Sequence, residues 1–301
     1  MRVDSIHGIN NSIGTPPRFM IIDILNYLKR NIMLPLILPL ALATGYADTP
    51  TIERPYENLT YTKERSHATT VHKVAVGWPY SLELVINQDG RKGLDRLSRM
   101  CGRLEEKEGK NALVAVNGSY FDPPTRRVIG TLIYRRMRLI NEKWDRAQIG
   151  IEDWKAPEFG YFFRADGASF DYLLTGGPYL VNNGENIVST SIESERFSKQ
   201  KNRPNPRTGI GKRADGTVVM IVADGRREAE RGLSLDELAE LFINEKCEQA
   251  INLDGGGSST MVLSGEFYGR EKTENIVANN PSDGHERAVA NGIVVVQQEK
   301  K

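Results

Sequence analysis

Three aspartates stand where buried strands are expected to end, and they are the residues best suited to chemistry. Asp254, Asp224 and Asp122 follow the apolar segments 250–253, 217–223 and 112–116, the last through Asn117. If these strands share a sheet, the three carboxylates converge. Two carboxylates suit cleavage of a glycosidic bond, one as acid and one as base or nucleophile. The same oxygens would also suit a hard cation.

A glycine run follows Asp254 directly and predicts a binding loop. The run Gly255, Gly256 and Gly257 is followed by the hydroxyls of Ser258 and Ser259. Glycines admit a ligand close to the backbone, and successive N–H groups can form a concave nest for an anion. The alternative is a turn between two strands with Asp254 as a local cap. Because consecutive glycines cost conformational entropy, a simple turn does not need three of them.

Basic residues gather before the next candidate strand. Seven Lys or Arg and no acid lie between Arg196 and Arg213. Arg207 begins the strand at the inner end of this run, where a guanidinium can bind phosphate through two parallel hydrogen bonds. Arg196, Lys199 and Lys201 are interpreted as a solvated charged loop.

The elements that would position these residues indicate one α+β domain from residue 48 onward. Helical spacing predicts an amphipathic helix over 93–108, and Ser234 with Glu237 forms a capping box for a second helix. Strands are expected at 71–76, 82–86, 179–181, 261–263 and 293–296, with a hairpin of 208–211 and 217–223. Residues 48–70 are interpreted as a linker or peripheral strand, and 189–206 as an exposed loop. We expect a mixed, largely antiparallel sheet flanked by helices.

Composition excludes several classes of protein. The 301 residues carry 40 Lys and Arg against 39 Asp and Glu, a formal net charge of +1. That composition excludes a wholly disordered, collagen-like or polytopic membrane chain, and it argues against nucleic acid as a partner. The four histidines lack ligand spacing, and two cysteines, Cys101 and Cys247, cannot build a zinc finger. Any metal would therefore be Ca or Mg on oxygen ligands, and pairing of the cysteines stays open.

The first 47 residues are expected to be an N-terminal extension and signal peptide. Lys29 and Arg30 precede an apolar run over 32–43, and small residues follow at 45 and 47. This order is typical of a cleaved export signal, and the run is shorter than a membrane-spanning helix. An uncleaved anchor or a buried helix is the alternative. Cleavage would start the mature chain near Asp48, in the periplasm or secreted, with no stable membrane span.

Seven segments in this order resemble the phosphodiester glycosidase family. They are VNGSYFD (116–122), TGGPYLVNNG (175–184), NPRTGIG (205–211), ADGR (223–226), LSLDELAELF (233–242), AINLDGGGSSTMVL (250–263) and NPSDGHERAVANGIVVV (280–296). The resemblance spans about residues 110–296, and the last two segments are the most specific. Ser119 and Tyr120 depart conservatively from the family's usual Gly and Phe.

The resemblance implies hydrolysis of a sugar-1-phosphodiester to free sugar and a phosphomonoester, with no cofactor required. It assigns phosphate to Arg207 and to Gly255, Gly256, Gly257, Ser258 and Ser259. Asp254 and Asp224 take the carboxylate roles, and which is acid and which base or nucleophile stays open. Asn117, Thr208 and Arg287 are further substrate contacts, and Asp122 is a candidate ligand for Ca or Mg.

Two other functions compete with this one. The first is a non-catalytic protein that binds envelope polysaccharide or exopolysaccharide. The second is a metal-dependent phosphodiesterase, which cleaves the phosphorus–oxygen bond instead of the bond to the anomeric carbon.

Overall fold

The computed structural model describes residues 50–297 apart from 78–80, 88–89, 91, 143–144, 153–154, 163–169 and 272–273. The predicted extension and signal peptide, residues 1–47, lie outside the described residues and stay a prediction. Within the described part of the chain, no helix has the length and apolar character that a membrane span requires.

The largest sheet has eight strands. In spatial order they are β1 (Thr51–Tyr56), β2 (Leu59–Ser66), β3 (Thr69–Val76), β17 (Val218–Ala223), β16 (Arg207–Arg213), β18 (Cys247–Asn252), β14 (Tyr179–Asn182) and β15 (Glu185–Asn186). The hairpin of β16 and β17 is confirmed, and β18 pairs with the other side of β16. The described residues 50–70 are therefore mainly strand, since β1 and β2 form one end of this sheet.

Two five-stranded sheets accompany it. One has the order β20 (Asn275–Val277), β19 (Met261–Ser264), β6 (Ala112–Asn117), β22 (Asn291–Val296) and β4 (Ser81–Ile86). The other has the order β10 (Met137–Ile140), β9 (Leu132–Tyr134), β13 (Tyr172–Thr175), β11 (Gln148–Ile151) and β12 (Glu158–Gly160). Two short pairs complete the strands, β21 (Ala288–Val289) with β5 (Asp95–Arg96) and β7 (Phe121–Asp122) with β8 (Arg127–Val128).

The strand pairings correct the expectation of one mixed sheet. Every pairing between the described strands is antiparallel, and the strands divide among several sheets. The α+β class and the flanking helices agree with the prediction. Backbone hydrogen bonds decide which strands pair, and these bonds leave little trace in residue type.

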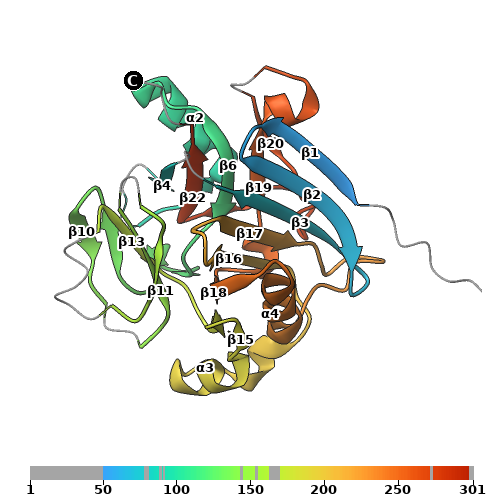
Figure 1. Ribbon diagram of the computed structural model, residues 1–301. Helices are drawn as coiled ribbons and strands as arrows, with labels where there is room; N and C mark the ends of the chain where they lie inside the picture. The colour runs from blue at the N-terminus through green and yellow to red at the C-terminus, as the bar shows by residue number, and fades with distance from the viewer. Residues whose placement is uncertain are drawn as a thin grey trace, which may run out of the picture. The chain divides into compact units, whose positions relative to one another are not determined.

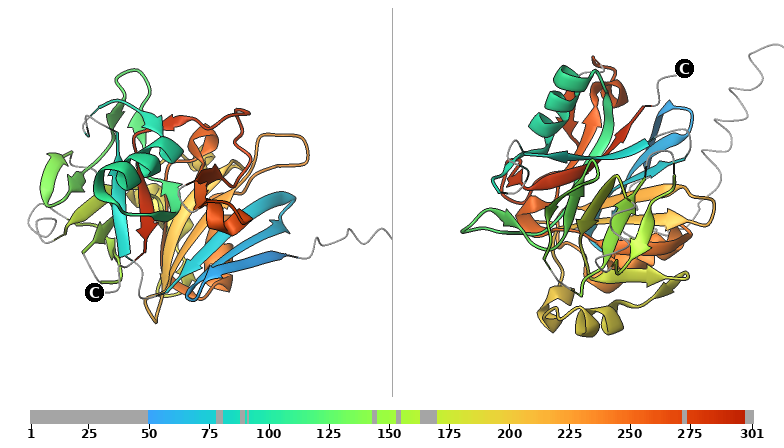
Figure 2. Two further views of the ribbon diagram at one scale, coloured as in Figure 1. Left: turned by 90° about the horizontal axis from the view of Figure 1, so that it is seen from above. Right: turned by 90° about the vertical axis from the view of Figure 1, so that its left-hand side faces the viewer.

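The main core lies between the sheets. Val222 of β17, Ile210 of β16 and Val116 of β6 belong to one buried cluster that also includes Ile149 of β11. On its outer face the eight-stranded sheet packs against α4 (Leu235–Asn244) and α3 (Val188–Ser194). The five-stranded sheet that contains β6 packs its other face against α2 (Leu97–Glu108). Figures 1 and 2 show α2 at one end of this stack and α3 at the other.

The helices confirm one feature that the sequence predicts and correct two others. The capping box of α4 is confirmed, since Ser234 Oγ accepts from the Glu237 N–H and the Glu237 side chain accepts in return. The helix predicted from 93 begins only at Leu97, because Asp95 and Arg96 pair with β21. The interpretation of 189–206 as a loop was wrong, since α3 and the 3-10 helix η2 (Lys199–Asn202) occupy much of it.

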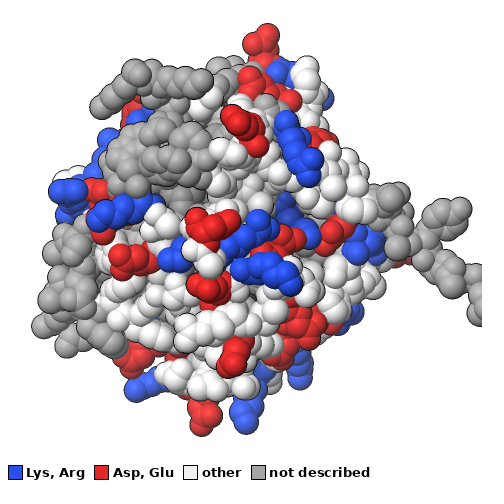
Figure 3. Space-filling view, viewed as in Figure 1, with Lys and Arg blue, Asp and Glu red and all other residues white. Residues whose placement is uncertain are grey.

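Charge and cysteine chemistry add little to the function. On the face shown in Figure 3, basic and acidic side chains are interspersed. Cys101 and Cys247 are both buried and free, and burial raises the pKa of Cys247 to about 12. Neither thiol is therefore set up as a nucleophile.

Candidate active site

Asn117 joins the end of β6 to the loop after β18. Its Nδ2 donates to the main-chain oxygen of Asp254 (2.7 Å), and its Oδ1 accepts from Thr208 Oγ1 (2.7 Å) and the Thr260 N–H (3.0 Å). The Asp254 N–H donates in turn to Gly118 O (3.0 Å). Asn117 and Thr208, both predicted substrate contacts, are completely buried. In this structure their polar groups position Asp254.

The Asp254 carboxylate is set up for proton transfer near neutral pH. Its Oδ1 accepts from the Gly255 N–H (2.9 Å), and the Ser258 side chain also bonds to it. Burial raises the pKa of Asp254 from its usual 3.8 to about 6, against the opposing hydrogen bond from Ser258. The positive charges of Lys201 and Arg287 also favour the ionised form. A carboxyl group of this kind can act as acid or as base.

Most N–H groups of the glycine run are engaged within the protein. Four of the five from Gly255 to Ser259 donate: Gly255 to Asp254 Oδ1, Gly256 to Pro206 O (2.9 Å), Ser258 to Gly255 O (3.3 Å) and Ser259 to Gly256 O (3.2 Å). The run forms a short 3-10 turn, so these donors satisfy the loop itself. Ser258 and Ser259 are buried; the Ser258 side chain bonds to Asp254, whereas Ser259 Oγ has no hydrogen-bond partner among the residues that the structure describes.

The glycines instead leave room for two guanidinium groups. A Cβ at Gly257 would lie 2.1 Å from Arg287 Nη2, and one at Gly256 would lie 3.1 Å from Arg226 Nη2. Arg226 Nε donates to Asn205 Oδ1 (2.7 Å), and this hydrogen bond holds the Arg226 guanidinium beside the glycine run. Arg226 also has φ +58, an uncommon backbone conformation for an arginine. The ADGR segment belongs to the family resemblance, but nothing in its sequence indicates a role for Arg226.

Arg207, the first residue of β16, is buried. Its Nε donates to Leu233 O (2.9 Å), and its Nη2 donates to Lys201 O (2.5 Å) and Arg203 O (2.7 Å). Burial lowers the pKa of Arg207 to about 10, with Tyr120 opposing that shift. Two of its three nitrogens are thus engaged with main-chain carbonyls, so Arg207 anchors η2 in this structure.

Lys201 comes to the site from η2. Its Nζ lies 4.7 Å from the centre of the Tyr120 ring and 5.9 Å from that of Phe197. Burial lowers the pKa of Lys201 although the nearby Asp254 charge opposes the shift. Lys201 as a whole is exposed, as the interpretation of a solvated segment expects, but nothing in the sequence indicates its contacts with the two rings.

Asp224 directly follows β17, and β17 pairs with β16, the strand that begins at Arg207. It is 3% exposed, and its Oδ1 accepts from the Asn280 N–H (2.9 Å). A Cβ at Gly225 would lie 2.8 Å from Pro206 N, and one at Gly255 would lie 2.8 Å from Pro206 O. Both candidate carboxylates therefore precede a glycine that packs on Pro206. Asp224 and Asp254 follow β17 and β18, which pair with the two sides of β16, so both aspartates lie at the same end of one sheet.

Asp122 does not join them. Its Oδ2 accepts from the Thr125 N–H (3.2 Å) and from Thr125 Oγ1 (2.5 Å), which makes it part of its own turn. Over the described ranges, no three His, Cys, Asp or Glu side chains are grouped so that they could hold a metal ion. The described side chains therefore do not fit the Ca or Mg site at Asp122 that the sequence suggested.

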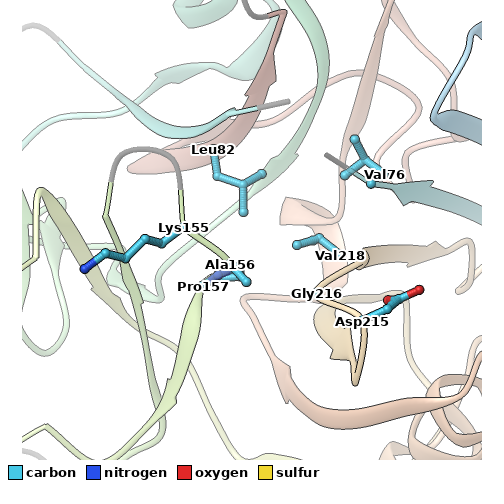
Figure 4. Close-up of a pocket in the computed structure, with 9 residues that line it drawn as sticks. Val76, Leu82, Lys155, Ala156, Pro157, Asp215, Gly216 and Val218 are labelled. Atoms are coloured by element: carbon cyan, nitrogen blue, oxygen red, sulfur yellow. The ribbon is translucent and has the colours of Figure 1, made fainter. Parts of the chain in front are cut away.

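A separate pocket of about 220 Å³ lies near the turn between β16 and β17. It is lined mainly by small and apolar residues, with Lys155 and Asp215 as its charged members. Figure 4 shows Leu82 and Val218 facing the cavity while the Lys155 amine points away. Because Val218 and Asp224 stand at opposite ends of β17, the pocket is about 20 Å from the candidate site.

Positive charge is in excess around Asp254. Lys201, Arg207 and Arg226 form no salt bridge with any residue that the structure describes, whereas Arg287 is paired with Asp283 at 2.6 Å. Uncompensated cations beside a half-buried carboxylate attract an anionic ligand. Lys201 and Arg226 were missed by sequence analysis, and the basic run and the ADGR segment were the only signals for them.

Comparisons with known proteins identify the family of this chain. The family model for phosphodiester glycosidases matches residues 110–296. The human N-acetylglucosamine-1-phosphodiester alpha-N-acetylglucosaminidase is 32% identical over 174 residues, which cover 54% of this chain and 34% of the human protein. The mouse protein of the same name is 33% identical over 166 residues, or 50% of this chain and 32% of its own. The chain thus matches about one third of the length of these relatives.

Solved structures share the fold. The catalytic domain of the zebrafish N-acetylglucosamine-1-phosphodiester alpha-N-acetylglucosaminidase, auto-inhibited by its pro-peptide, superposes with a TM-score of 0.64 at 22% identity. The match covers 83% of this chain and 88% of the zebrafish chain. A hypothetical protein from Synechocystis gives a TM-score of 0.67 at 14% identity over 84% and 64% of the two chains. Because the family model matches well over half of the sequence, the chain belongs to the phosphodiester glycosidase family.

Proposed function

We propose that this chain hydrolyses the glycosidic bond of a sugar-1-phosphodiester and releases free sugar and a phosphomonoester. The observation that carries the proposal is the single carboxyl group of Asp254, with its pKa raised to about 6, beside the unpaired charges of Lys201 and Arg226. The carboxyl group suits proton transfer, and the cations suit a phosphate group next to it. The named relatives act on a phosphodiester-linked N-acetylglucosamine, which makes that sugar the first to try.

The reaction needs three contributions from the protein. Lys201 and Arg226 hold the phosphate and stabilise the charge that it gains when the bond from the anomeric carbon to oxygen breaks. A water oxygen bonds to the anomeric carbon, and a carboxylate accepts the water proton. The leaving oxygen keeps the bonding electrons as the phosphomonoester departs, and a second carboxyl group beside it donates a proton. Asp224 and Asp254 supply the carboxyl groups.

Metal-dependent attack on phosphorus is the less favoured alternative. Enzymes that use two metals for this purpose need several clustered ligands, and the described residues contain no such group of side chains. A purely binding protein would need the cationic surface and would have no use for a carboxyl group tuned by burial.

Hydrolysis in oxygen-18 water tests the proposed bond cleavage. We expect the label on the anomeric hydroxyl of the released sugar, because a glycosidase delivers water to carbon. Mass spectrometry of both products reads the result. Label in the phosphate would show attack on phosphorus and overturn the proposed function, and no turnover on a panel of sugar-1-phosphodiesters would do the same.

Lys201→Met tests the phosphate contact, with Lys199→Met in the same 3-10 helix as its control. We expect KM for the phosphodiester to rise by about tenfold or more, since a hydrogen bond to a charged group contributes about 1.5–3 kcal/mol. KM for an uncharged aryl glycoside of the same sugar should change little, and Lys199→Met should affect neither. Equal effects on both substrates would remove Lys201 from the phosphate site.

A further inference from the structure

A buried histidine that the reaction has not used faces Asp224. His72 lies on β3 and is 1% exposed. Its Nδ1 is 2.8 Å from Tyr61 Oη, and its Nε2 is 3.7 Å from Asp224 Oδ2. Nε2 is buried and has no hydrogen-bond partner among the residues that the structure describes. A buried nitrogen left unpaired is costly, so its position opposite a carboxylate calls for an explanation.

The strand register places the two side chains on one face. His72 of β3 is paired with Val222 of β17, and Asp224 follows two residues later. Residues two apart on a strand point to the same side, so His72 and Asp224 are diagonal neighbours on the inner face of the sheet. Both lie among residues of β2, β3 and β17 that fix their backbone on each side.

The contacts of the His72 ring point to a proton on Nε2. A ring nitrogen of histidine donates when it carries a proton and accepts when it does not. Burial, followed by neighbouring Tyr268 and Glu53, raises the pKa of Tyr61 well above its ordinary value, so the phenol keeps its proton. That proton has two possible acceptors, His72 Nδ1 and Tyr268, so the Tyr61 contact does not by itself decide the ring. A bare Nε2 would point its lone pair at an oxygen of Asp224, whereas a protonated Nε2 can donate to that oxygen, so the ring proton is placed on Nε2. That N–H faces the carboxylate oxygen of Asp224.

We propose that His72 is a positioning residue for Asp224, and that the Nε2–H of His72 holds Asp224 as the carboxylate that accepts the proton of the attacking water. The inference rests on the proposed function. Two donors would then hold the group, His72 on Oδ2 and the Asn280 N–H on Oδ1. Hydrogen bonds from donors stabilise the charged form of a carboxylate. At 3.7 Å the His72 contact is long, as catalytic hydrogen bonds often are before substrate binds.

This assignment separates the roles of the two aspartates. With Asp224 as the proton acceptor, Asp254 is the acid beside the leaving phosphate. The pKa of Asp254, raised by burial to about 6, fits that role, because a fraction of the group stays protonated near neutral pH. His72 lies outside residues 110–296, so the family match does not assign it.

The test compares His72→Phe with His72→Gln and with Val74→Ala. Phe keeps a ring and removes the donor, whereas Gln restores an N–H near the position of Nε2. Val74→Ala, two residues along the same face of β3, removes packing alone. We expect kcat for His72→Phe to fall by about 10²-fold with KM nearly unchanged. His72→Gln should recover at least tenfold of that loss, and Val74→Ala should retain kcat after correction for folded protein.

A second measurement does not depend on activity. Nitrogen-15 NMR of the His72 ring should show the proton on Nε2, and Asp224→Asn should shift that signal. A proton on Nδ1, or equal kcat for the Phe and Gln variants, would overturn the inference while leaving the proposed function standing. If the wild-type chain hydrolyses no sugar-1-phosphodiester, the proposed function fails instead.

Discussion

Asp254→Asn should lower kcat by about 10²-fold or more without loss of the fold. The substitution keeps the size of the side chain and removes its ability to transfer a proton, and general acid–base catalysis contributes about 10²–10⁴-fold. The measurement is kcat on the phosphodiester, with circular dichroism and a melting curve on the same sample. Asp215→Asn, an exposed aspartate in the turn between β16 and β17, is the matched control and should keep full activity.

The direction of the stability change follows from the raised pKa. The folded pKa of Asp254 is about 6, above its usual 3.8, because burial penalises the charged form. The group therefore contributes fully to stability below about pH 4, and that contribution is lost as the pH rises through about 6. At pH 7 the wild type holds a penalised charge that the amide lacks, so Asp254→Asn should melt at an equal or higher temperature. Near-normal kcat would remove Asp254 from the mechanism, and a large drop in melting temperature would assign it a structural role.

The sequence located the carboxyl groups because strand ends and glycines leave a clear trace. Asp254 and Asp224 each follow a run of buried residues and precede glycine, and their strands β18 and β17 lie on either side of β16 in one sheet. The role of the glycine run could not be predicted from the sequence. Its meaning depends on the guanidinium groups of Arg226 and Arg287 that pack on it, and these arrive from distant segments.

Arg207 and Lys201 show that residue type alone does not predict what a basic side chain contacts. Arg207 begins a strand in a basic run, yet its Nε and Nη2 bond to main-chain carbonyls, which have no sequence signal. Lys201 lies in the same run, and its Nζ reaches the Tyr120 ring from η2. Polar sequence predicted a loop there, since the buried Val188 and Ile192 of α3 are too few to establish a helical period.

The sheets were predictable in part. Hairpin β16–β17 follows from two strands and an Asp-Gly turn, which are local features. The partners of β3, β18 and β6 depend on contacts between residues far apart in the chain, so the division into three main sheets did not follow from periodicity. Asn117 illustrates the consequence, because its importance comes from joining two sheets that the sequence did not separate.

Asn117→Ala should destabilise the chain and abolish activity together. The substitution leaves the Thr260 N–H and the Asp254 carbonyl buried without their partner, and each unpaired group costs about 1–3 kcal/mol. With the added cavity, the free energy of unfolding should fall by about 3–5 kcal/mol. A chain of this size loses roughly 2–4 °C per kcal/mol, so the melting temperature should drop by roughly 10 °C.

Thr208→Val is the graded comparison for Asn117→Ala. It removes only the hydroxyl that donates to Asn117 Oδ1, and Oδ1 keeps the Thr260 N–H as a second donor. We therefore expect a loss of about 1 kcal/mol and nearly normal KM. A rise in KM for Thr208→Val without a change in melting temperature would make Thr208 a substrate contact.

If Asn117→Ala melts like the wild type, the bridge between the sheets does not carry the stability assigned to it. Activity measured well below the melting temperature then reports whether Asp254 has moved, because its main-chain oxygen would have lost the Asn117 amide that holds it.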